Sequence, residues 1–128
     1  MITEPLAAPI DFDELRDRID GDHELLRGLT EIFIDESVEL ERLLTSAVER
    51  GDAPALREAA HGLKGALGNL AAHAAAETAA RLEHLAAEGE LVSVPEVCAA
   101  LEQQLTHVRE ALLDLDPVSY THLTLPTN

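Results

Sequence analysis

The chain of 128 residues is poor in cysteine, lysine and aromatic side chains. It has one Cys, one Tyr, two Phe and no Trp, and Lys64 is its single lysine. One cysteine excludes an intramolecular disulfide and any metal site built from several thiolates. Cys98 falls within an apolar pattern of helical spacing, which predicts a buried structural thiol rather than a reactive one.

Positive charge is also scarce, because nine Lys and Arg stand against 25 Asp and Glu, giving a formal net charge of -16. Such a charge excludes nucleic acid as a partner and disfavours docking on an anionic membrane. No apolar run approaches the roughly 20 residues that span a bilayer. The first residues, MITEPLAAPID, lack the basic region and apolar core of a secretory signal. These absences predict a cytoplasmic protein.

What the sequence does have is alanine and leucine, within a hydrophobic content of 46%. This composition favours helices over strands. Apolar periodicity, acidic caps, Gly and Pro predict a short helix over 11–19 and longer ones over 22–49, 53–71, 73–88 and 93–114. Short connections make sequential helices antiparallel neighbours. The expected fold is all-α, an up-and-down antiparallel four-helix bundle with a short N-terminal capping helix.

The domain is expected to span residues 11–116. Residues 1–10 contain two prolines and read as an extended lead-in. The tail PVSYTHLTLPTN, residues 117–128, changes composition abruptly and reads as a flexible or foreign extension. The inner stripe of the long second helix is predicted to contain Leu25, Leu26, Leu29, Ile32, Phe33, Leu40, Leu43, Leu44 and Ala47. The inner stripe of the last helix is predicted to contain Val97, Cys98, Leu101, Leu105, Val108, Leu112 and Leu115.

The stretch AAHGLKGALGNLAA, residues 59–72, combines a helical apolar stripe with three glycines. A helix turns by about 100° per residue. On that wheel, the leucines and most alanines gather opposite His61, which therefore points outward. The residues within roughly 60° of His61 on the wheel are Arg57, Lys64, Gly65 and Gly68.

An exposed glycine inside a helix costs about 1 kcal/mol relative to alanine. Missing side chains at Gly65 and Gly68 would give a partner or a bulky group close access to the His61 imidazole. An imidazole is a nucleophile that is largely neutral at cellular pH, and Lys64 can offset added negative charge. An accessible His beside an ammonium is therefore equipped to carry a phosphoryl group. Gly62 lies about 100° from His61 on the wheel and fits this explanation least well, so the sequence leaves its role open.

The segment AHGLKGALGNLAAHAAAETAARLE resembles the signature of histidine-containing phosphotransfer (HPt) domains. The resemblance extends over about residues 10–114, including the long helix and the Gly-Asp turn before the signature helix. One departure is Ala71, which stands where the family often has Gly. The residues that fill the pattern are Ala60, His61, Leu63, Lys64, Gly65, Asn69, Leu70, Leu82 and Glu83.

The resemblance implies that His61 accepts a phosphoryl group on Nε2, that Lys64 contacts the phosphoryl oxygens, and that Gly65 leaves space for them. It also implies a monomeric shuttle between the aspartates of response-regulator receiver domains, or of a hybrid histidine kinase. The receiver would supply Mg²⁺, and this chain would need no cofactor of its own. The sequence has no Gly-rich ATP loop, so phosphorylation from ATP is not expected.

Two other readings compete with phosphotransfer. Glu58 and His61 have the Glu-x-x-His spacing of di-iron bundles, but a second such motif is missing. His73 with Glu77, and His84 beyond them, are better explained as a solvated helix face, so no metal site is predicted. The second alternative is a docking or dimerisation module that binds receivers without being phosphorylated.

Overall fold

The computed structural model describes residues 8–115, in which all regular structure is helical. The helices are α1 (Phe12–Ile19), α2 (His23–Arg50), α3 (Ala53–Asn69), α4 (His73–Ala87) and α5 (Val94–Leu115). None of these helices has the length and apolar character that crossing a membrane requires. Most of the lead-in and the tail from residue 117 lie outside the described residues.

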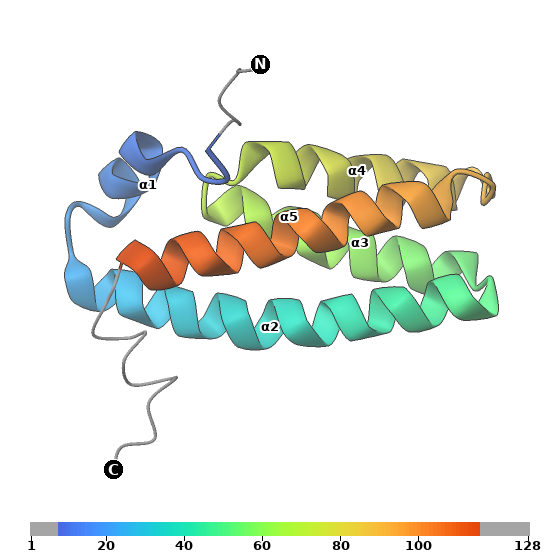
Figure 1. Cartoon of the computed structure of the whole chain (residues 1–128), viewed down its shortest axis with the longest axis horizontal. Helices are drawn as coiled ribbons and strands as arrows, with labels where there is room; N and C mark the ends of the chain where they lie inside the picture. Colours follow the sequence, from blue (N-terminus) through green and yellow to red (C-terminus); the bar gives the residue numbers. More distant parts are fainter. Residues whose placement is uncertain (1–7, 116–128) are drawn as a thin grey trace, which may run out of the picture.

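The four long helices form an antiparallel bundle in which each sequential pair packs together and α5 closes against α2. Figure 1 shows α1 as a short helix at one end of the bundle, ahead of the start of α2. The predicted all-α fold, an up-and-down four-helix bundle with a short N-terminal helix, is therefore confirmed.

Aspartate caps begin the first three helices, as the sequence indicates. The side chains of Asp11, Asp22 and Asp52 accept hydrogen bonds from backbone N–H groups in the first turn. Each cap satisfies donors that have no partner within the helix. Gly51 ends α2 with a φ of 64°, a left-handed conformation that glycine adopts without strain.

The turn between α3 and α4 makes α3 end at Asn69, two residues earlier than predicted. Ala71 has a φ of 59° and is fully buried. This is the position where the related signature often has glycine, and the left-handed backbone gives the physical reason for that preference. The carbonyl of Ala71 accepts a hydrogen bond from the N–H of Asp11 (2.9 Å), which joins the start of α1 to this turn.

The core lies between the inner faces of the bundle, but the sequence overstates the inner stripe of α2. Leu26, Phe33, Leu44 and Ala47 are buried as predicted. Leu25, Ile32 and Leu43 are exposed, with Ile32 62% accessible, and Leu115 at the end of α5 is exposed as well. A bundle helix contacts its neighbours over only part of its circumference, so an apolar stripe wider than that contact continues onto the surface.

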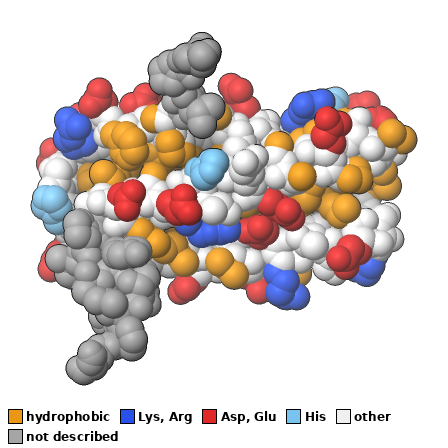
Figure 2. All heavy atoms as spheres, in the orientation of Figure 1, with side chains coloured by type: hydrophobic (Ala, Val, Ile, Leu, Met, Phe, Trp, Pro, Cys, Tyr) orange, Lys and Arg blue, Asp and Glu red, His pale blue; other side chains and the backbone are white. Residues whose placement is uncertain are grey.

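Acidic side chains dominate the molecular surface. On the face shown in Figure 2, Asp and Glu side chains are scattered over the helices, apolar patches lie between them, and Lys and Arg are fewer. Many of the basic side chains are neutralised locally. Arg16 pairs with Asp13, Arg42 with Glu39 and Arg50 with Asp52, all at exposed positions. Such exposed pairs contribute little to stability.

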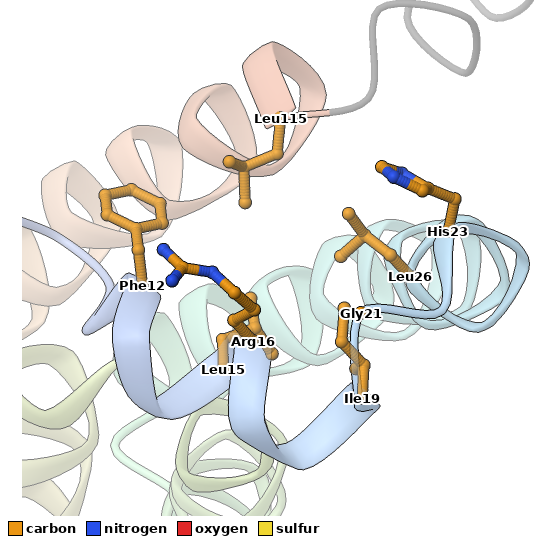
Figure 3. Close-up of a pocket in the computed structure, with 8 residues that line it drawn as sticks. All are labelled: Phe12, Leu15, Arg16, Ile19, Gly21, His23, Leu26 and Leu115. Carbon is orange, nitrogen blue, oxygen red and sulfur yellow. The ribbon is translucent and has the colours of Figure 1, made fainter.

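Helix α1 covers the end of the core with an apolar face. Leu15 and Ile19 are buried, and Phe12 is half-buried. Together with Leu26 of α2 and Leu115 of α5, these side chains line a cavity of about 280 Å³, and Figure 3 shows them converging on it. The capping helix therefore leaves an apolar hollow at this end of the bundle.

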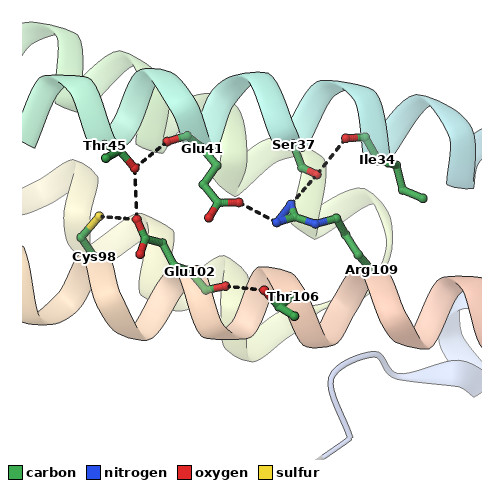
Figure 4. A network of polar contacts seen from close by, with 8 residues as sticks. All are labelled: Ile34, Ser37, Glu41, Thr45, Cys98, Glu102, Thr106 and Arg109. Carbon is green, nitrogen blue, oxygen red and sulfur yellow. Dashed lines mark hydrogen bonds and ion pairs between the residues drawn. The ribbon is translucent and has the colours of Figure 1, made fainter.

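A polar seam joins α2 to α5 (Figure 4). Arg109 of α5 donates hydrogen bonds to Ser37 Oγ (3.0 Å) and to the Glu41 carboxylate (2.5 Å) of α2. Further along, Glu102 Oε2 lies 3.1 Å from Thr45 Oγ1 and accepts from Cys98 Sγ. Burial, with Glu102 and Glu41 nearby, raises the pKa of the Cys98 thiol to about 12, which agrees with the predicted unreactive thiol.

We expect Glu41→Ala to destabilise the fold by about 2 kcal/mol, because it leaves the Arg109 guanidinium half-buried without its counter-ion. The Arg109 and Glu41 side chains are only 17% and 25% exposed. Burial raises the pKa of Glu41 even with Arg109 beside it, so desolvation is not fully offset. The double variant Glu41→Leu with Arg109→Met should therefore recover most of the loss in urea unfolding. A double variant less stable than Glu41→Ala would contradict this.

Candidate functional site

The outer face of α3 carries the candidate site. Leu56, Ala59, Leu63 and Leu67 turn their side chains into the core, and the His61 side chain points outward with 67% of its surface exposed. This is the orientation that the helical wheel predicts. The buried stripe fixes the rotation of α3 in the bundle, and that rotation determines where the imidazole lies.

His61 and Lys64 share one partner, the carboxylate of Glu83 on α4. Glu83 Oε2 lies 2.8 Å from His61 Nδ1, and Glu83 Oε1 lies 2.8 Å from Lys64 Nζ. Only 17% of the Glu83 side chain is exposed, whereas the His61 ring stays open to solvent. The three side chains therefore form a cluster between α3 and α4, with the carboxylate at its base.

The charge of this cluster defines the state of the His61 ring. Hydrogen bonds from Lys64 and, to a smaller degree, from His61 lower the pKa of the Glu83 carboxyl, although burial opposes the shift. An ionised carboxylate can only accept hydrogen bonds, so His61 Nδ1 carries the proton. In the neutral ring, Nε2 then holds the free lone pair. The exposed nitrogen is the nucleophilic one.

Glu83 is the member of this cluster that reasoning from the sequence missed. Glu83 is the last residue of the signature pattern, but no role was predicted for it. Glu83 lies 22 residues after His61, on the next helix, and only the packing of α3 against α4 brings the two together. A helical wheel gives directions around one helix only. It therefore could not predict which residue of α4 faces His61.

The three glycines of α3 divide into two kinds. A Cβ built at Gly65 or Gly68 would meet nothing within 4 Å, in keeping with the open face that the sequence predicts around His61. A Cβ at Gly62 would lie 3.2 Å from both methyl groups of Leu40 on α2. The sequence left the role of Gly62 open, and this contact supplies a reason for the glycine. Gly62 lets α2 and α3 pack closely.

Arg57 lies one turn before His61 and is exposed. It borders a surface hollow beside the imidazole, as the wheel suggests. That hollow is lined by Asp52, Pro54, Ala55, Arg57, Glu58, His61 and Glu83. Gly68 has a second role besides openness, because its carbonyl accepts a hydrogen bond from Arg18 of α1 (2.6 Å). The predicted site residues therefore lie on one face, with Arg57 and Gly68 at its two ends.

The comparisons with known proteins bear on this cluster. Residues 28–111 match the family model described as Hpt domain. A solved structure, the histidine-containing phosphotransfer protein B (HptB) from Pseudomonas aeruginosa PAO1, is 29% identical in sequence and superposes with a TM-score of 0.81. The match covers 88% of this chain and 97% of that one. The comparison with curated proteins gave no match. The chain is a phosphotransfer protein of the phosphorelay type and belongs to the Hpt domain family.

Proposed function

We propose that His61 carries a phosphoryl group on Nε2 between the aspartates of receiver domains. The observation that supports this most directly is the 2.8 Å contact of Nδ1 with the Glu83 carboxylate, which in the neutral ring leaves the lone pair on Nε2 of an exposed side chain. The Nε2 lone pair attacks phosphorus as the bond to the aspartyl oxygen of the donor breaks, and the donor regains a free carboxylate. Transfer to the next receiver reverses these steps.

Glu83 has an electrostatic role in this transfer. When Nε2 bonds to phosphorus, the ring keeps its Nδ1 proton and becomes positively charged. The Glu83 carboxylate, 2.8 Å from Nδ1, faces that developing charge and stabilises it. The same hydrogen bond holds the ring orientation, so the nucleophile needs no reorganisation before it reacts.

Lys64 supplies positive charge for the incoming phosphoryl group. Its ammonium is bonded to Glu83 and half-exposed beside His61, within a chain of net charge -16. An incoming phosphoryl group brings negative charge into this field, and Lys64 Nζ can turn to its oxygens. A divalent cation at the same place would have to displace Lys64 from Glu83, so we expect the Mg²⁺ of the reaction on the receiver.

The exposed apolar residues of α2 favour a protein as the partner. Leu25, Ile32 and Leu43 lie within roughly 20° of one another on the wheel of α2. Leu40 lies about 60° further round and contacts the Gly62 position of α3. An apolar strip, interrupted by the exposed Glu36, therefore runs along the helix that packs against α3. Exposed strips of this kind are typical of docking surfaces, and a receiver domain is the partner we propose.

The test is incubation of the purified chain with receiver domains phosphorylated on aspartate, with Mg²⁺ present and ATP absent. We expect a label on this chain that is labile to acid and stable to alkali, and loss of label from the donor. A panel of receivers, run in both directions, would identify the partners and the direction of transfer. Binding without label for every receiver would instead support a docking module that is not phosphorylated.

Replacing Lys64 with Ala should slow phosphoryl transfer about tenfold, the effect of losing about 1.4 kcal/mol of transition-state stabilisation. The Lys64 side chain packs outside the core, so the thermal midpoint and the helicity should change little. Rapid-quench measurement of label on the chain gives the rate, and circular dichroism gives the fold. Lys64→Arg keeps the charge and should retain more of the rate. A marked loss of helicity in Lys64→Ala would contradict the proposed role.

Replacing Glu83 with Ala should also slow transfer about tenfold, through the orientation and protonation of His61 rather than through direct contact. The tautomer of the His61 ring is the property that separates this role from a structural one. In ¹⁵N spectra, the Nδ1-protonated form of His61 should dominate in the wild type and decline in Glu83→Ala. Glu83→Gln retains an acceptor without the charge and should lie between the two. An unchanged tautomer in Glu83→Ala would refute the assignment.

A further inference from the structure

A second group of titratable side chains lies away from His61, where α1 meets the start of α4. Asp11 is the N-cap of α1, Glu14 lies in its first turn, and His73 is the first residue of α4. Each offers one ligand atom, and the three atoms all lie within 4.8 Å of one another. His73 Nε2 is 2.7 Å from Glu14 Oε1, a contact between α4 and α1.

The backbone holds these three residues in place. The N–H of Asp11 bonds to the carbonyl of Ala71, two residues before His73. Arg18, one turn after Glu14, donates to the carbonyl of Gly68 on the other side of the same turn. Both bonds join α1 to the α3–α4 turn, so the backbone of the three residues is already held in place. Only their side chains would have to move for all three to bind one metal ion.

The free oxygens of the group also suit a metal. Asp11 uses Oδ1 to cap the N–H of Glu14, which leaves Oδ2 available. Glu14 binds Arg18 through Oε2, which orients Oε1 toward His73. His73 and Asp11 also line a hollow at the surface, so an ion and its water can reach them.

We propose that Asp11, Glu14 and His73 form a binding site for a divalent transition-metal ion, with Zn²⁺ the best fit. One imidazole nitrogen and two carboxylate oxygens are a donor set that zinc accepts, with water in the fourth position. Zinc ligands lie about 2.0–2.2 Å from the metal, so tetrahedral ligand atoms are closer to one another than 4.8 Å. Glu14 is half-exposed and His73 is exposed, so both side chains can move to bring their ligand atoms closer together around the ion. The metal ion then takes the place of the hydrogen-bonding proton between His73 Nε2 and Glu14 Oε1.

The bound metal would join the capping helix α1 to α4. This site is separate from the His61 cluster and does not depend on phosphotransfer. Arg18 lies beside Glu14 and opposes the metal by charge, but it also fixes the carboxylate, as outer partners of metal ligands do.

The test is calorimetric titration of the full chain with ZnSO₄, with thermal unfolding in the presence and absence of zinc. His73→Gln should weaken binding at least about tenfold and abolish the rise in the unfolding midpoint. Asp11→Asn is a sharp second variant, because Asn caps a helix as well as Asp does but lacks the carboxylate. It should weaken zinc binding while the unfolding midpoint without zinc stays unchanged.

Two other histidines beside carboxylates provide the controls. His84 lies 3.7 Å from Glu88, and His61 contacts Glu83. His84→Gln and His61→Gln should leave the zinc affinity of the main site unchanged. Absence of binding to the wild type, or affinity that His73→Gln does not alter, would overturn the proposal. Affinity that falls in His61→Gln instead would place the zinc at the phosphotransfer cluster.

Discussion

Replacing His61 with Gln is expected to abolish phosphoryl transfer to this chain, with no acid-labile label after incubation with any phosphorylated receiver. Gln can still reach Glu83 by a hydrogen bond, but its amide nitrogen has no lone pair available for attack on phosphorus. The side chain is 67% exposed and lies outside the core, so the thermal midpoint should stay close to that of the wild type. The measurement is label on the chain at a time when the wild type is fully phosphorylated.

A second exposed histidine, on a different helix, provides a matched control. His107 of α5 is exposed, whereas the polar partners of Glu83 are His61 and Lys64. His107→Gln should be labelled at the wild-type rate. Label that persists in His61→Gln would show that another side chain is the acceptor, and label lost in both variants would point to a nonspecific effect on the bundle.

Replacing Gly65 with Leu should nearly abolish transfer while making α3 more stable. Leucine has a higher helix propensity than glycine by about 0.8–1 kcal/mol, and a Cβ at Gly65 meets no other atom. The side chain would therefore extend over the open face beside His61, where the proposed mechanism requires the aspartate of a receiver to come within bonding distance of Nε2. We expect the rate to fall at least about a hundredfold, equivalent to about 2.7 kcal/mol.

Two variants separate obstruction from helix stabilisation. Gly65→Ala gains the helix propensity with a single methyl group and should lose much less activity. Ala99→Leu adds the same bulk at an exposed position of α5 and should transfer normally. A Gly65→Leu variant that raises the midpoint and still transfers at the wild-type rate would show that access over Gly65 is not needed.

Local features of the sequence were sufficient for the helices and for the orientation of the candidate site. Asp22, Gly51 and Asp52 mark helix ends within a residue or two because capping depends on groups a few positions away. The outward direction of His61 follows from the 100° step and the leucine stripe of its own helix. The roles of His61, Lys64 and Gly65 in transfer, and the bounds of the domain, stay predictions.

Relations between helices could not be predicted in this way. The sequence placed Leu25, Ile32 and Leu43 in the core, yet α2 is turned so that they are exposed. It gave no role to Gly62, whose missing side chain leaves space that Leu40 occupies.

The sequence by itself therefore determined the five helices, their caps and the outward face of α3, because each depends on spacing along one helix. The tertiary structure decided which side chains meet across helices: Glu83 with His61 and Lys64, and Glu14 with His73. The physical reason is that periodicity fixes directions around a helix axis, whereas a contact also requires the rotation and axial position of the neighbouring helix. Those two quantities are set by the packing of the whole core.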